Sequence, residues 1–172
     1  MIMGYYVSTT DCRILVKREN ADKALLALVK FNDENDDKKN GGSFGPDGAK
    51  EKWFSWMPKD FREFDTFGKF LSSLGFSYLE NDEMDYVLTG YSDKTGQEDL
   101  LMEAIAHFVE DGSFAEWSGE DGERWRWDFK GGKMTIRNGV VTWSEETYTP
   151  SESFRILQME LEAIKKAIGE TK

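Results

Sequence analysis

Apolar and polar residues alternate in short blocks near the N-terminus of the chain. The blocks at 5–8 and 13–17 predict two β-strands, and the polar residues 9–11 predict the turn between them. From 21 to 29 the apolar residues recur every three or four positions, which is the spacing of one face of an α-helix. Asn20 precedes this helix and is predicted to be its N-cap.

The middle of the chain continues with a helix and a hairpin. Asp65 is predicted to cap the helix, and Gly75 suits the left-handed residue that follows a helix. Segments near 76–79 and 86–90 then predict two antiparallel strands. The apolar face of the helix consists of Phe67, Phe70, Leu71 and Leu74.

Two further helices begin at capping boxes, in which a Thr hydroxyl and a Glu three residues later satisfy the first backbone amides. Thr95 and Glu98 mark one helix, and Thr149 and Glu152 mark a C-terminal helix at about 150–168. Apolar residues of the C-terminal helix step by 3, 4, 3 and 4, so it either packs on a sheet or pairs with a second copy in a homodimer. These residues are Phe154, Leu157, Leu161, Ile164 and Ile168.

Three glycine-containing turns divide positions 114–146 into the strands of an antiparallel β-meander. Two-residue turns at Gly131-Gly132 and Asn138-Gly139 have compatible registers, which gather the apolar residues on one face. The predicted pairs are Trp127 with Ile136, Phe129 with Met134, Ile136 with Val141, and Met134 with Trp143. The apolar face carries Trp125, Trp127, Phe129, Met134, Ile136, Val141 and Trp143. The opposite face carries Arg124, Arg126, Asp128, Thr135, Arg137 and Thr142.

The first turn of the meander fits this register less well. Continuing the register places Glu116 beside Trp125, which requires either a bulge or a position at the edge of the sheet. The shared apolar face nevertheless indicates that the tryptophans of the meander belong to the core and do not form an exposed stacking surface.

The pattern as a whole predicts an α+β fold in a single domain over 1–172, with an antiparallel β-meander packed on one face by three to four helices. A loop at 32–64 interrupts the pattern, and a loop of this length is either functional or mobile. Within this loop, Trp53 and Trp56 are expected to anchor the chain onto the body of the protein.

The charge balance excludes several classes of function. The 172 residues include 33 acidic and 22 basic side chains, for a formal net charge of −11. Direct nucleic-acid binding and binding to an anionic membrane both need clustered Lys and Arg, so neither is expected. The sequence predicts no signal peptide and no membrane span, and the single Cys12 predicts no disulfide, so a cytoplasmic location is expected.

Residues with catalytic or metal-binding potential are few. His107, the one histidine, lies near the C-terminus of a predicted helix, where a histidine is favourable without any catalytic role. The sequence contains no P-loop, dinucleotide-binding or nucleophile-elbow motif. The acidic run from Asp33 lacks the glycine and the glutamate that a calcium loop needs. No cofactor and no metal site is therefore predicted.

Charged and aromatic side chains supply the candidate binding sites. The acidic segment Glu110–Glu123, together with the segment 80–85, either keeps the loops soluble or forms an acidic surface that would attract a basic partner. Arginines of the meander either bind a phosphate or carboxylate ligand or pair with acids of the two long helices and the loops. The candidate binding residues are Trp53, Trp56, Glu116, Glu120, Asp121, Glu123, Arg124 and Arg126.

Four phrases, "MGYYV", "KWFSWM", "GYSDKTGQEDL" and "WSGEDGERWRWDFKGGK", resemble those of a family of small proteins encoded in bacteriophage and prophage regions of bacterial genomes. The resemblance covers most of the first 140 residues and excludes the helix from Pro150 onward. It implies an accessory protein in the cytoplasm of a bacterial host cell. It carries no functional residue over to this chain.

Two functions are compatible with these features. The first is a non-enzymatic accessory protein of phage type that binds another protein through its acidic surface, with a host nucleic-acid-handling or defence protein as the inhibited partner. The alternative is a small-ligand-binding protein or enzyme with its site under the Gly41–Phe61 loop, lined by Trp53, Trp56, His107 and the arginines of the meander.

Overall fold

The computed structural model describes residues 5–39, 41, 52–142 and 150–169. The chain divides into two compact units, Met1–Val140 and Val141–Lys172. The first unit combines a six-stranded antiparallel sheet with helices, which confirms the predicted α+β class. A single domain over 1–172 stays a prediction, and the two units are described separately.

The sheet has the strand order β2-β3-β1-β4-β5-β6, and every pair of neighbours is antiparallel. The strands are β1 (Tyr6–Val16), β2 (Phe76–Glu80), β3 (Tyr86–Lys94), β4 (Phe114–Gly119), β5 (Arg124–Lys130) and β6 (Lys133–Gly139). The predicted hairpin of β2 and β3 is confirmed. The N-terminal strand β1 lies in the middle of the sheet, where it joins this hairpin to the meander β4-β5-β6.

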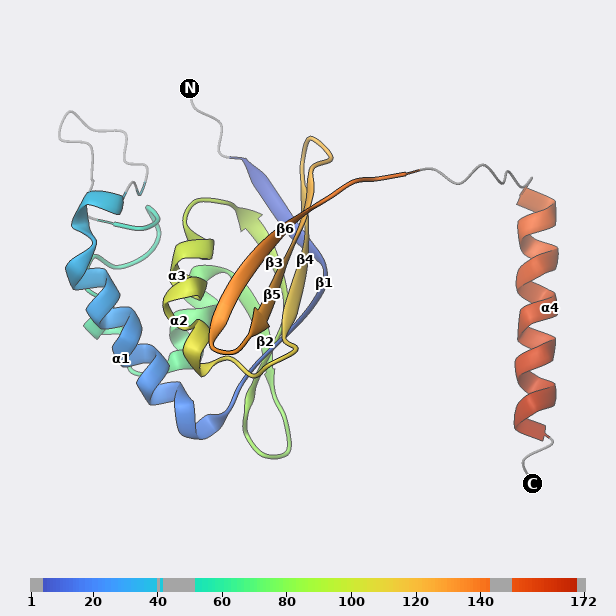
Figure 1. The fold of residues 1–172 in the computed structure, drawn as a ribbon, viewed down its shortest axis with the longest axis horizontal. Coiled ribbons are helices and arrows are strands. Elements are labelled where there is room, and N and C mark those ends of the chain that lie inside the picture. The colour runs from blue at the N-terminus through green and yellow to red at the C-terminus, as the bar shows by residue number, and fades with distance from the viewer. Residues whose placement is uncertain (1–4, 40, 42–51, 143–149, 170–172) are drawn as a thin grey trace. The chain divides into compact units, whose positions relative to one another are not determined.

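Helices α1 (Arg18–Glu34), α2 (Phe67–Leu74) and α3 (Glu98–Ala104) lie on one face of the sheet (Figure 1). Three short 3₁₀ turns, η1 (Asp36–Lys38), η2 (Phe61–Glu63) and η3 (Ala106–Phe108), follow α1, precede α2 and follow α3, respectively. Helix α4 (Pro150–Gly169) belongs to the second unit.

The core fills the space between the sheet and these helices. Side chains of the strands alternate between this core and the opposite face, as the two-residue period of a strand requires. From the sheet, the largest fully buried side chains are Trp117, Trp127, Phe129 and Ile14. The predicted apolar face of α2 is confirmed, because Phe67, Phe70, Leu71 and Leu74 are all buried. Gly75 follows α2 with φ of 111°, the left-handed conformation predicted for it.

The predicted turn at 9–11 is wrong. β1 runs without interruption through these residues, and its register with β4 shifts by one residue between Thr9 and Asp11. The Thr9 hydroxyl accepts a hydrogen bond from the backbone amide of Tyr91 at 2.9 Å, on the neighbouring strand β3. The polar residues therefore form a β-bulge inside a central strand. A bulge inserts one extra residue into the strand, and this break in the alternation resembles a turn in the sequence.

The meander differs from the prediction at both ends. The pairs Trp127–Ile136 and Phe129–Met134 are confirmed, but Glu116 lies opposite Arg126, and Trp117 is the residue beside Trp125. Residues 138–139 form no turn, because β6 continues through them and pairs with the start of β5. The predicted pairing of Ile136 with Val141 is therefore wrong, and Trp143 lies outside the described residues.

Three of the predicted helix caps differ from those in the structure. Helix α1 is preceded by Lys17, and Thr66 caps α2 by accepting from the Lys69 amide at 3.2 Å, so Asn20 and Asp65 are not caps. Helix α3 begins at Glu98, whose carboxylate accepts hydrogen bonds from the Thr95 hydroxyl and the amide of Gly96. The predicted pair Thr95 and Glu98 is thus in contact, but Glu98 is the first residue of the helix and Thr95 is not its N-cap. The predicted caps Thr149 and Glu152 lie outside the described side chains.

The described part of the loop 32–64 is anchored as expected. Trp53, Phe54, Met57 and Phe61 are buried in the core. The Trp53 indole donates to the side-chain oxygen of Asn32 at 3.1 Å, which ties the loop to α1. Residues 42–51 lie outside the described part of the chain.

Candidate functional site

The polar face of the meander is an internal ion-pair network. Arg126 lies 2.5 Å from the carboxylate of Glu116 and 2.9 Å from that of Asp128, and its guanidinium lies 4.0 Å above the ring of Phe114. Arg137 contacts the other carboxylate oxygen of Asp128 at 2.6 Å. The candidate residues Glu116 and Arg126 therefore neutralise each other.

The electrostatics of Asp128 follow from this network. Partial burial by itself raises the pKa of Asp128, but hydrogen bonds and charge from Arg126 and Arg137 outweigh burial and hold that pKa below its usual range. The arginines pair with acids of the sheet itself, and not with acids of helices or loops. Their pairing leaves little reason for this face to bind an external anion.

A hollow of about 500 Å³ lies at the end of the sheet where β5 begins and β6 ends. Its floor includes the half-buried ring of Trp125, which stacks on the buried ring of Trp117 at a centroid distance of 5.8 Å and an angle of 2°. Below the floor, Trp117 contacts the rings of Trp127 at 4.3 Å and Tyr91 at 5.3 Å. The hollow is lined by Tyr5, Thr95, Glu123, Arg124, Trp125, Asn138 and Gly139. We call it the Trp125 pocket.

The prediction that the meander tryptophans are core is confirmed for Trp127, which is 1% exposed. Trp125 is only half-buried and presents part of its ring to the pocket. It is thus the outer member of a buried aromatic cluster. Burial of the cluster beneath it fixes the orientation of this ring.

Exposed acids of the β4–β5 turn border the Trp125 pocket. Glu120, Asp121 and Glu123 are all exposed. The turn is held by hydrogen bonds from the Glu120 amide to the carbonyl of Tyr6 at 3.1 Å and from the Gly122 amide to the carbonyl of Gly119 at 3.0 Å. The turn therefore holds these acids on a defined backbone, and Glu123 among them lines the pocket.

Tyr5 joins the pocket wall to this acidic turn. Its hydroxyl donates to the carboxylate of Asp121. This hydrogen bond raises the pKa of Tyr5 to about 12 and lowers the pKa of Asp121, so the carboxylate stays charged at neutral pH. Arg124 at the same rim makes no ion pair within the described part of the chain.

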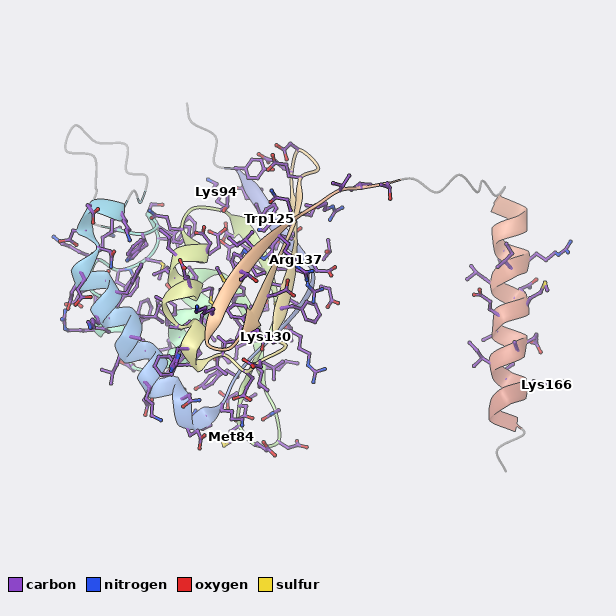
Figure 2. The ribbon with its side chains drawn as sticks, viewed as in Figure 1. Met84, Lys94, Trp125, Lys130, Arg137 and Lys166 are labelled. Carbon is purple, nitrogen blue, oxygen red and sulfur yellow. The ribbon has the colours of Figure 1, made fainter. Side chains whose placement is uncertain are left out.

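The second acidic segment, 80–85, does not extend this surface. In the register of β1, Val7 lies beside Gly119 and Val16 lies beside Tyr86. Nine residue steps of a strand separate these positions, which corresponds to about 30 Å. Trp125 and Met84 accordingly lie at opposite ends of the sheet (Figure 2). The acidic segments that were predicted to act together are thus separate.

The alternative site under the loop is not assembled by the described residues. Trp53 is 1% exposed and stacks on Phe31, while Trp56 is 42% exposed and donates to the carbonyl of Ser73 at 3.0 Å. His107 lies against the β5–β6 turn, where a side-chain carbon on Gly132 would come within 2.6 Å of its ring. The arginines of the meander lie on the sheet face away from the helices, so they do not meet Trp53.

Other kinds of site have little support among the described residues. No group of three or more His, Cys, Asp or Glu side chains in this part of the chain is arranged to hold a metal ion. Cys12 is buried, and burial raises the pKa of its thiol to about 12, which opposes a thiolate nucleophile. None of the described helices has the length and apolar character needed to cross a membrane.

Comparisons of this chain with protein-family models, with curated proteins and with solved structures find no match. The assignment of the candidate site therefore depends on the geometry described above.

The sequence pattern indicates only part of the Trp125 pocket. It marks Glu123 and Arg124 as candidate binding residues, but it predicts Tyr5 in a strand, Asn138 in a turn and Thr95 as a helix cap. The residues are far apart in the sequence, and the pocket becomes visible only through the pairing of β5 with β6 and the position of β1.

Proposed function

We propose that the protein is a non-enzymatic binding protein whose β4–β5 turn and Trp125 pocket contact a basic segment of another protein. The observation that carries this proposal is the combination of exposed carboxylates with an aromatic pocket floor. Glu123 lines the pocket together with the half-buried ring of Trp125, and Asp121 of the same turn is hydrogen-bonded to the pocket residue Tyr5.

This combination suits a lysine or arginine side chain of the partner. An indole face attracts a cation, by about 0.5–1 kcal/mol at exposed sites and more when water is excluded. Nearby carboxylates provide the charge-assisted hydrogen bonds that such a cation needs. Tyr5 supports this arrangement, because its hydrogen bond holds the Asp121 carboxylate in place.

Arg124 makes the rim mixed in charge, which favours a protein segment over a polycation. The Arg124 guanidinium has no ion-pair partner among the described residues, so it is available to a carboxylate or backbone carbonyl of the bound segment. Recognition then depends on the order of charges along the partner and not on total charge alone.

The partner class that we propose is a host protein that handles nucleic acid or acts in defence, which the chain would inhibit as a phage-type accessory protein. A basic surface that normally contacts phosphates is complementary to the acidic rim. The net charge of −11 favours association with such a surface and opposes direct binding to nucleic acid.

Capture of partners from bacterial lysate tests the acidic rim. The variant Glu120→Lys/Glu123→Lys reverses two exposed charges of the β4–β5 turn, and the matched control Asp82→Lys/Glu83→Lys reverses two exposed charges at the opposite end of the sheet. Both variants carry the same net charge. We expect the control to keep the partners of the natural protein and the rim variant to lose them. Equal capture by both variants would contradict the proposal.

A second pair of variants tests the pocket itself. Asn138→Phe places a large ring at the pocket wall, and Ile136→Phe changes a half-exposed residue two positions away that does not line the pocket. Capture should fall at least tenfold for Asn138→Phe, a change of about 1.4 kcal/mol, and stay unchanged for Ile136→Phe. Addition of DNA to the captured complex then identifies the partner class, because a nucleic-acid-binding partner should be released by competition.

A further inference from the structure

Helix α4 carries a stripe of exposed apolar side chains. Phe154 is 63% exposed, Leu157 62%, Leu161 51% and Ile164 56%. At 100° per residue these four side chains fall within about 80° of the helix circumference. Their spacing of three, four and three residues is that of the a and d positions of a coiled coil. Ile168 continues the spacing in the sequence, but its side chain lies outside the described residues.

The apolar stripe of α4 is suited to packing against another surface. Most helices in proteins obtain their stability from packing of the apolar face and not from helix propensity alone. Contiguous apolar surface of this kind is unfavourable in water and is typical of an interaction site.

Charged residues beside the stripe favour a second copy of α4 as its partner. With Phe154 and Leu161 at a positions, Glu160 occupies a g position and Lys165 occupies the following e position. In a parallel pair of identical helices, the g residue of one helix lies next to the following e residue of the other, so Glu160 of each copy would face Lys165 of its partner. In an antiparallel pair, g positions face g positions and e positions face e positions, so Glu160 would not face Lys165.

We propose that α4 pairs in parallel, in register, with α4 of a second copy of this chain. Glu160 makes no ion pair among the described residues and is free to form the intermolecular contact. Lys165 lies 2.9 Å from Glu162 on its own helix, but both side chains are more than half exposed, so this contact is weak and readily exchanged. The inference is independent of the partner that the Trp125 pocket binds.

Sedimentation equilibrium of the full-length chain tests the proposal. The natural protein should sediment with the mass of two copies, and Leu161→Glu should sediment as one copy. The matched control Met159→Glu places the same charge on the other side of α4, at a residue that is 62% exposed, and should keep the mass of two copies. A natural protein that sediments as a single copy would overturn the proposal, whether α4 is then covered by its own chain or by a different protein.

Exchange of the charges at Glu160 and Lys165 provides a second test in case Leu161→Glu unfolds the helix. Glu160→Lys and Lys165→Glu should each weaken self-association about tenfold, because each creates two like-charge contacts in the symmetric pair. The double variant Glu160→Lys/Lys165→Glu should restore the natural dissociation constant to within about threefold. Additive weakening in the double variant would show that these residues do not face each other.

A cysteine at position 154 reports the orientation of the helices. In a parallel pair the two copies of Phe154→Cys lie side by side, and mild oxidation should link them through a disulfide. In an antiparallel pair they lie at opposite ends of the seam, so failure to form the link in a protein that sediments as two copies would overturn the parallel arrangement.

Discussion

Two acidic residues illustrate how local environment sets the charge state of a side chain in this protein. Asp128 lies between Arg126 and Arg137, and the arginines lower its pKa. Glu98, the first residue of helix α3, is 3% exposed, and burial raises its pKa although the Thr95 hydroxyl and the Gly96 amide donate to it. The two carboxylates should therefore affect stability in opposite directions as pH changes.

We expect Asp128→Asn to lower the free energy of unfolding at neutral pH by about 1–3 kcal/mol, because the neutral amide loses two charge-assisted interactions. The pKa of Asp128 is lowered in the folded state, so its contribution is present above the pKa of the unfolded chain and is lost as pH falls through the folded value. Urea unfolding at neutral and acidic pH measures this. Asp82→Asn is the control, since Asp82 is exposed and makes no ion pair among the described residues. Equal effects of the two variants would contradict the network.

Glu98→Gln should show the opposite trend. The pKa of Glu98 is raised in the folded state, so the folded protein binds the proton more tightly than the unfolded chain does. The stability of the natural protein relative to Glu98→Gln should therefore be greatest below the unfolded pKa and fall as pH rises through the folded pKa. Urea midpoints of both proteins across the acidic range measure this difference. A difference that grows with pH would be inconsistent with desolvation as the main cause of the shift.

At the scale of elements, tight turns whose residues are close in sequence are the most predictable features. The β5–β6 turn has two glycines with φ of 59° and 71°, in the left-handed region. This turn sets the register that pairs Trp127 with Ile136. The two glycines differ in their surroundings, because a side-chain carbon would meet nothing at Gly131 and would lie 2.6 Å from the His107 ring at Gly132.

We expect Gly131→Ala to destabilise the protein by about 1–2 kcal/mol, which is the cost of a left-handed backbone for an L-residue. Gly132→Ala should cost about 1 kcal/mol more, since His107 must also move. Thermal unfolding measures both. Adding His107→Ala should remove only the extra cost of Gly132→Ala and should not rescue Gly131→Ala. Rescue of both variants, or of neither, would contradict the close contact between His107 and Gly132.

Contacts between distant segments explain where the structure differs from the predicted elements. Asn138-Gly139 favours a hairpin turn locally, yet pairing with Trp125 and Arg124 on β5 extends β6 through it. The segment at Thr9 resembles a turn, yet strands on both sides hold it as a bulge. The α2 helix and the β2–β3 hairpin were predictable because their signals are contained in the elements themselves.

At the scale of the whole molecule, the sheet distributes the acidic segments to its two ends. The end near the β4–β5 turn combines exposed acids with the Trp125 pocket. The sequence pattern marks Glu120, Asp121 and Glu123 as candidates. Prediction of the residues that line the pocket requires the strand order of the sheet, which no local pattern contains. The net charge of −11 favours a partner with a basic surface. The proposed contact surface is the β4–β5 turn with the Trp125 pocket.

Hydrogen exchange of backbone amides in the free protein and in complex with a captured partner tests the binding surface most directly. The predicted result is slower exchange on binding in the β4–β5 turn at 119–124 and in β6 at 138–139, with no change in the β2–β3 turn at 81–85. Slower exchange in the β2–β3 turn, with unchanged exchange beside Trp125, would contradict the account.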